Sequence, residues 1–198
     1  MKTIVKVLSC KKLSCLFLTL SLSACLSTDP LPESYYYLLD EPNYDQYVFS
    51  SSPLSSDQKL TVKVNIVSVA DYLSQPNLVM KLENHQINIA NYHAWGEDLP
   101  SGIQRVLIKD LNKKFKQATF FERCTNCAEL SVYIDHFYPT SSGEVILSGS
   151  YEIKLTSNQF YRQDFSFSAT QSETGYKYSV AKMRLLLSQL ADNIVLQK

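Results

Sequence analysis

Three segments in the second half of the chain constrain its fold most, because each alternates apolar and polar residues. The first places Leu130, Val132, Ile134 and His136 on one face, the second Val145, Leu147, Gly149, Tyr151, Ile153 and Leu155, and the third Phe165, Phe167 and Ala169. A period of two is typical of a strand with one buried face. The connections, residues 139–143 and 156–159, have the length of hairpin loops. The sequence therefore predicts an antiparallel meander of three strands.

The first half of the chain contains further strand candidates. Residues 60–66 alternate in the same way, and the parity shifts after residues 67–69, which suggests a bulge or a strand end. Short candidates at 78–82 and 86–90 flank a turn at 83–85. The β-prone segment 35–39 (YYYLL) needs a sheet to join, and residues 40–59, rich in Pro and Ser, indicate a loop.

Two segments have the spacing of amphipathic helices. In the first the apolar positions are Leu99, Ile103, Val106, Leu107, Leu111, Phe115 and Ala118, and in the second Tyr176, Val180, Met183, Leu187, Leu190 and Ile194. Asp98 followed by Pro100 favours a helix start, and Gly175 directly precedes the second helix. This order predicts an α+β fold, a mostly antiparallel sheet with both helices packed on one face.

The N-terminus is typical of an export signal. Residues 1–12 carry four lysines and no acid, residues 13–22 are largely apolar, and Ser23 and Ala24 precede Cys25. Ten helical residues span only about 15 Å, half of a ~30 Å hydrocarbon core, which disfavours a permanent membrane span. The string Leu22-Ser23-Ala24-Cys25 resembles the bacterial lipobox, in which the cysteine is lipidated.

Together with the strand and helix patterns, this resemblance divides the chain into three predicted parts. They are a signal peptide (1–24), a lipidated tether (25–34) and a single α+β domain (35–198). Several acyl chains on Cys25 would anchor the protein stably, whereas one chain is marginal. In such lipoproteins an aspartate after the cysteine favours retention in the inner membrane, and here Leu26 follows. We therefore expect attachment to the outer membrane, facing the periplasm.

The charge balance gives no reason to expect nucleic acid as a partner. The full chain has 19 Lys and Arg against 19 Asp and Glu, and four of these lysines lie in the predicted signal peptide, so 15 remain against 19. Binding to phosphates requires a net basic surface. A basic stripe on the first helix (Arg105, Lys109, Lys113 and Lys116) indicates a solvated face, with an anionic surface or acidic partner as the alternative.

One local motif stands out, Cys124-Thr125-Asn126-Cys127, which follows the first helix. The main interpretation is a structural disulfide in an oxidising compartment. A zinc site would need two further ligands at a fitting spacing. A thioredoxin-like redox pair would need a helix N-terminus after the first cysteine. Two free thiols are the remaining alternative.

Common catalytic and nucleotide-binding motifs are absent from the sequence, namely G-x-S-x-G, G-x-G-x-x-G, the P-loop and H-E-x-x-H. His85, His93 and His136 are more simply read as ordinary core or surface histidines than as bases. The Glu97-Asp98 pair lies at a helix start, where acids complement the macrodipole. We therefore expect no catalytic residue, metal or cofactor.

Several short strings together resemble one lipoprotein family. They are Tyr35-Tyr36-Tyr37-Leu38, Val69-Ala70-Asp71-Tyr72-Leu73 with Val79, Ala90-Asn91, Trp95-Gly96-Glu97-Asp98-Leu99, and Val145-Ile146-Leu147-Ser148-Gly149-Ser150-Tyr151. In this order, after a lipobox, they resemble the PqiC/YmbA family of ABC-type transport auxiliary lipoproteins. Ala70, Gly96 and Asp98 depart from the family pattern, and the cysteine pair at 124 and 127 is not part of it.

The resemblance implies a function without catalytic residues. It implies an outer-membrane lipoprotein that partners an MCE-domain protein, PqiB-like or MlaD-like, whose hydrophobic tunnel carries lipid between the two membranes. It also implies a possible homo-oligomeric ring at the end of that tunnel. Our candidate partner surface comprises Tyr35, Tyr36, Tyr72 and Trp95, since aromatic residues are enriched at interfaces. For the tyrosine-rich start of the domain, the alternative is a strand followed by an adhesive loop.

Two other functions share some of these features. An outer-membrane assembly or sorting lipoprotein acting on protein or lipopolysaccharide would have the same anchor and fold class. A periplasmic enzyme would require a deep polar pocket that joins His93 or His136 to Asp135.

Overall fold

The computed structural model describes residues 30–40, 60–157 and 159–196. The predicted signal peptide, Cys25 and all but the first residue of the predicted loop 40–59 lie outside the described residues. The elements below belong to one compact unit, Ser34–Lys198.

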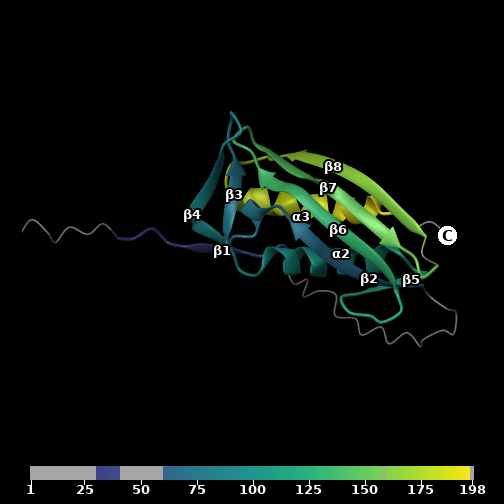
Figure 1. The fold of residues 1–198 in the computed structure, drawn as a ribbon. Coiled ribbons are helices and arrows are strands. Elements are labelled where there is room, and N and C mark those ends of the chain that lie inside the picture. The colour runs from purple at the N-terminus through teal and green to yellow at the C-terminus, as the bar shows by residue number, and fades with distance from the viewer. Residues whose placement is uncertain (1–29, 41–59, 158, 197–198) are drawn as a thin grey trace, which may run out of the picture. The chain divides into compact units, whose positions relative to one another are not determined.

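Within the described residues, eight strands form two sheets, and two long helices cover one of them (Figure 1). The strands are β1 (Tyr35–Tyr37), β2 (Leu60–Val69), β3 (Asn77–Lys81), β4 (Ile87–Trp95), β5 (Ala118–Phe121), β6 (Ala128–Pro139), β7 (Glu144–Lys154) and β8 (Phe160–Thr170); the helices are the 3-10 turn η3 (Asp71–Leu73), α2 (Leu99–Lys114) and α3 (Tyr176–Asn193). The five-stranded sheet has the order β5-β2-β6-β7-β8 and the three-stranded sheet β1-β4-β3.

The longest pairings are antiparallel, as the sequence predicts. β6, β7 and β8 form the expected meander, and β3 and β4 form a hairpin whose turn places Asn84 and His85 at positive φ. β2 instead pairs in parallel with both β5 and β6, and β1 pairs in parallel with β4. The α+β fold class is confirmed, and the parallel pairs are the part that the residue pattern did not reveal.

Both helices pack on the same face of the five-stranded sheet. α2 covers β2 and β5, α3 covers β6, β7 and β8, and the two helices contact each other (Figure 1). Fully buried side chains such as Ile103, Leu107, Leu130 and Leu187 fill the layer between helices and sheet. Burial drives this arrangement, because each element presents one apolar face.

Helix α2 begins as expected and ends one turn early. The Asp98 carboxylate accepts a hydrogen bond from the backbone N–H of Ser101 (3.1 Å), with Pro100 in the first turn. The predicted apolar repeat ran to Ala118, but Phe115 already caps the helix and Ala118 opens β5. The prediction of a longer helix was wrong because pairing with β2 outweighs the helical spacing of these last residues.

A β-bulge in β6 corrects the predicted position of His136. The register with β7 shifts between Ile134 and His136, so His136 is exposed and Phe137 takes the core position. Gly149 lies opposite this bulge, and a Cβ atom there would overlap the carbonyl oxygen of Tyr133. A second register shift occurs between Ile66 and Ser68 of β2, just before the change of parity predicted after residues 67–69.

Candidate functional site

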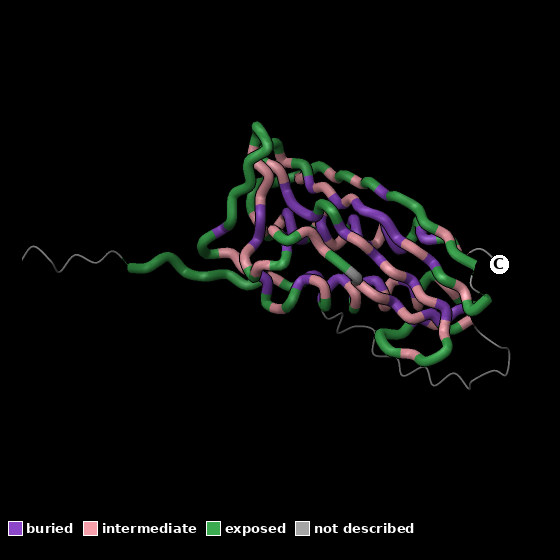
Figure 2. Tube along the Cα trace, viewed as in Figure 1, coloured by how far each residue is buried: buried purple, intermediate pink, exposed green. Residues whose placement is uncertain are grey.

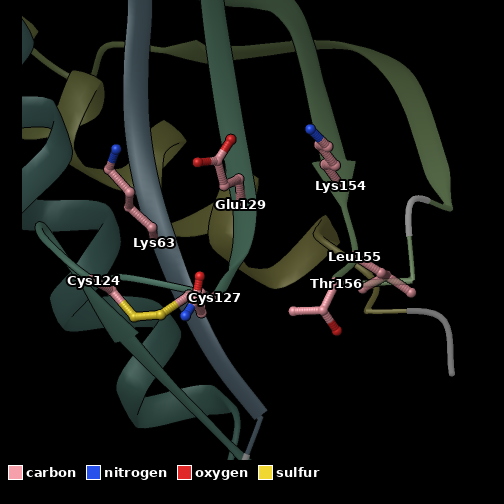
Figure 3. A pocket seen from close by; sticks show the side chains of 8 residues that line it. Lys63, Cys124, Cys127, Glu129, Lys154, Leu155 and Thr156 are labelled. Carbon is pink, nitrogen blue, oxygen red and sulfur yellow. A yellow bond between two sulfur atoms is a disulfide. The ribbon is translucent and has the colours of Figure 1, made fainter.

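The cysteine motif lies in an unusually short connection between β5 and β6. Both strands run parallel to β2 and flank it, since Val62 of β2 is the partner of both Phe120 and Ala128. A crossover between parallel strands usually takes about a dozen residues or more, whereas here residues 122–127 suffice. Asn126 adopts a positive φ of 57° within it. The chain therefore passes directly across β2, next to Lys63 (Figure 3).

The sulfur atoms of Cys124 and Cys127 are placed as in a disulfide, with 6.0 Å between the Cα atoms. Both residues line a pocket of about 410 Å³, together with Lys63, Asn126, Glu129, Lys154, Leu155 and Thr156. A crosslink would hold the short crossover closed over the sheet. The disulfide itself stays a prediction that needs a chemical test.

A second cluster joins β1, β4 and the start of α3 through aromatic rings. The His93 ring stacks on Tyr35 (ring centroids 5.5 Å apart) and also contacts Tyr176 (4.4 Å). The Tyr37 hydroxyl lies 2.9 Å from His93 Nδ1, within hydrogen-bond distance. Burial, and secondarily Tyr35, raises the pKa of Tyr37. His93 thus has a structural role in attaching the small sheet to helix α3.

The four aromatic residues of the predicted partner surface have different environments. Tyr35 and Tyr36 are exposed on β1, with 51% and 71% of their surface accessible. Trp95 is 7% exposed and packs in the hydrophobic core, while the following Gly96 donates its N–H to the Tyr37 carbonyl. The exposed part of the surface therefore lies on β1, and Trp95 supports it from the neighbouring strand β4, where it is the register partner of Tyr37.

Tyr72 belongs to a separate contact between η3 and β6. Its hydroxyl donates to the Asp135 carbonyl (2.7 Å) and lies 2.9 Å from His136 Nδ1. Burial is the main cause that raises the pKa of Tyr72, and Tyr138 and Asp135 add to it. These bonds fix η3 on β6 at the bulge, a role that the sequence did not indicate.

The pocket at the cysteine pair does not include the histidines that the enzyme alternative requires. Asp135 and His136 are both exposed, and Tyr72 contacts the backbone carbonyl of Asp135 rather than its carboxylate. The described pocket is lined by none of the residues 93, 135 and 136. Among the described residues no helix is long and apolar enough to cross a membrane.

Ion pairs account for half of the predicted basic stripe, whose last member, Lys116, lies beyond the end of α2. Arg105 forms a double hydrogen bond with the Glu97 carboxylate, at 2.5 and 2.6 Å, and this bond raises the pKa of Arg105. Lys109 pairs with Asp40 at 2.8 Å, whereas Lys113 and Lys116 are exposed. The stripe is thus less basic than its sequence suggests.

Comparison with known proteins gives one family and several related folds. A family model described as "ABC-type transport auxiliary lipoprotein component" matches residues 44–195. A crystal structure titled only as an uncharacterized protein is similar with a TM-score of 0.70 and 21% identity, covering 82% of this chain and 96% of that one. Protein XCC0632 from Xanthomonas campestris is similar with a TM-score of 0.58 and 12% identity, covering 71% and 84%. No curated protein matches the sequence. At these identities the two structures support the fold alone.

Proposed function

Since the chain belongs to the family of ABC-type transport auxiliary lipoprotein components, we propose that it is a non-catalytic, lipid-anchored part of an MCE-type lipid transport system. In this proposal the acyl chains on Cys25 sit in the outer membrane and the folded domain faces the periplasm. The observation that carries the proposal is the lipobox-like string Leu22-Ser23-Ala24-Cys25 ahead of a family match that spans 44–195. The mechanism is positional: the anchor fixes the domain near the membrane, and the domain holds its partner there.

The length of the tether supports this mechanism. Cys25 precedes Tyr35 by ten residues, which span at most about 35 Å when fully extended. Two prolines, Pro30 and Pro32, restrict the backbone conformations that this segment can adopt. In this proposal the domain therefore lies within about 35 Å of the lipidated cysteine.

We propose that the exposed tyrosines of β1 form the contact with the MCE-domain partner. Tyr35 and Tyr36 expose large amphipathic rings, and such rings contribute contact area at low conformational cost. Tyr72 and Trp95 act indirectly in this proposal, since the first fixes η3 on β6 and the second is a core residue of β4, next to β1.

A ring of identical subunits fits the two unlike edges of the five-stranded sheet. One edge is the four-residue strand β5 and the other the eleven-residue strand β8. Contacts between unlike edges are head-to-tail, and such contacts close into rings when the rotation between subunits permits it. Mass measurement of the detergent-extracted lipoprotein tests this part, and a monomeric mass at micromolar concentration would contradict it.

The anchor is tested by a Cys25→Ala variant expressed in a bacterial envelope. We expect loss of acyl labelling, a change in gel mobility, and release of the variant from the outer-membrane fraction into the soluble periplasm. A Cys124→Ala variant is the matched control and should be labelled like the wild type. Unchanged acyl labelling of Cys25→Ala would contradict the proposal.

The partner is tested by affinity purification of the anchored protein from crosslinked membranes. Recovery of an MCE-domain protein with its membrane subunits supports the transport function. Recovery of an outer-membrane assembly complex without any MCE-domain protein would instead favour the assembly or sorting function.

A further inference from the structure

A row of charged side chains crosses the sheet face that the helices leave uncovered. Lys63 of β2 is the register partner of Glu129 of β6, which in turn is the partner of Lys154 of β7. Neighbouring strands lie about 4.8 Å apart, and register partners project to the same face. Figure 3 shows the three side chains side by side at the pocket. We call Lys63, Glu129 and Lys154 the charged row.

The charged row does not neutralise itself. Opposite charges on adjacent strands often pair directly, yet within the described residues no ion pair of 4 Å or less involves any of these three side chains. By contrast, the next row on the same face contains the Glu152–Arg162 pair at 3.0 Å. The two ammonium groups and the carboxylate therefore remain available to a ligand.

The surroundings add polar and apolar groups suited to a small amphipathic molecule. Asn126 and Thr156 line the same pocket, and Leu155 contributes an apolar wall. The row ends on two exposed aromatic residues, since Phe121 pairs with Lys63 and Phe160 with Lys154. These rings are 42% and 57% exposed at the two edges of the sheet.

We propose that this pocket binds a zwitterionic phosphodiester that carries a primary amine, which is the chemistry of a phosphoethanolamine headgroup. The carboxylate of Glu129 accepts hydrogen bonds from the ligand ammonium, and a flanking lysine donates to the phosphate. A two-carbon spacer between amine and phosphate spans about one interstrand distance, ~4.8 Å, which is the spacing of the charged row. A ligand that has the phosphate but no amine would leave the Glu129 carboxylate without a partner. The charged row therefore favours the zwitterion over a simple anion.

The source of the ligand rests on the proposed function. In a lipid transport component the zwitterion is the headgroup of a membrane phospholipid, and Phe121 and Phe160 would contact its glycerol and acyl carbons. A soluble phosphodiester has the same headgroup chemistry without the acyl chains, and the experiment separates the two.

The test is a calorimetric titration, in which a soluble phosphodiester is added to the full lipoprotein in detergent micelles. Glycerophosphoethanolamine is expected to bind with one site per chain, and glycerophosphoglycerol, which lacks the amine, at least about tenfold more weakly. Absence of binding, or equal binding of the two diesters, would overturn the proposal. Vesicles that contain phosphatidylethanolamine should compete with the soluble diester; failure to compete would overturn the lipid as the source.

Three variants assign the effect to the charged row. Glu129→Gln is expected to remove the preference for the amine, and Lys154→Gln to weaken both diesters about tenfold. Lys113→Gln changes an exposed lysine on α2 and should leave both affinities unchanged. A Glu129→Gln protein that keeps its preference for the amine would overturn the assignment. Loss of diester binding with continued capture of the MCE-domain partner would refute the pocket and leave the proposed function intact.

Discussion

The two sheets of this protein differ in what covers them. The five-stranded sheet has one face under α2 and α3, and its inward residues, such as Val64 and Leu147, are completely buried. In the described part of the chain the three-stranded sheet is less well covered: most of β4 is coloured as exposed or intermediate in Figure 2. Its residues Ile87 and Ile89 are 42% and 44% exposed. The difference indicates that stability resides mainly in the first sheet, and that the second sheet has apolar surface available for contact.

The small sheet is nevertheless attached firmly at one end. Trp95, Ala90 and Leu78 belong to the main core, and His93 contacts Tyr176 at the start of α3. The end of β4 at Trp95 therefore packs in the core, whereas the end at Ile87 is exposed. The exposed residues belong to a strand that the core holds in place.

The largest expected difference between the two sheets comes from truncating a leucine under the helices. Leu107→Ala removes a fully buried side chain between α2 and the sheet and should lower the free energy of unfolding by about 3–4 kcal/mol, because it leaves a cavity. Ile89→Ala on β4, the matched control, should cost less than about 1 kcal/mol. Denaturant unfolding measures both, and equal losses would contradict the comparison.

Close packing opposite the β6 bulge gives the next largest effect. Gly149→Ala should cost about 3 kcal/mol, because the new methyl group would overlap the Tyr133 carbonyl and force β6 and β7 apart. Gly143→Ala has open space around it and a φ of 86°, so only backbone strain of about 1 kcal/mol applies. In thermal unfolding, Gly149→Ala should therefore lose more stability than Gly143→Ala. A smaller loss for Gly149→Ala would contradict the close approach of β7 to the Tyr133 carbonyl.

The predicted disulfide should add to the stability of the large sheet at its β5 edge. A Cys124→Ser/Cys127→Ser double variant should lose about 2 kcal/mol of stability, since the crosslinked loop is short. Non-reducing mass spectrometry of the wild-type protein from the periplasm should show a mass two hydrogens below the reduced form. Two free thiols there would contradict the disulfide.

The smallest expected effect concerns Tyr72, which attaches η3 to β6. Tyr72→Phe should cost about 1 kcal/mol at neutral pH through its lost hydrogen bonds. The folded protein raises the pKa of this phenol above its unfolded value of about 10, so its contribution is present below pH 10 and is lost as the pH rises further. Stability of the wild type should therefore fall above pH 10, with a shallower fall in Tyr72→Phe. Identical slopes in the two proteins would show that Tyr72 ionises as readily in the folded state as in the unfolded chain, which would contradict this prediction.

Much of the fold follows from local sequence patterns. The meander, both helix starts and the hairpin of β3 and β4 depend on neighbours in the chain, and period and capping residues such as Asp98 reveal them. The parallel pairing of β2 with β5 joins residues 58 positions apart, as in Leu60 with Ala118. No local pattern encodes such a pairing, and the four-residue β5 was therefore missed.

The candidate site was less predictable than the fold. The bulge in β6 reversed the parity at His136, because one extra residue moves every later side chain to the other face. The charged row of Lys63, Glu129 and Lys154 depends on the register of three strands. In the sequence these residues appear only as isolated polar positions of alternating segments.

The contact made by Tyr36 tests the central claim most directly. A photo-crosslinking amino acid replaces Tyr36 in the full lipoprotein in intact cells, and the same substitution at Lys113 on α2 serves as the control. We predict that illumination joins position 36 to an MCE-domain protein, that position 113 gives no such product, and that Cys25→Ala reduces the yield. Capture of an outer-membrane assembly component at position 36, with no MCE-domain protein at either position, would contradict the account.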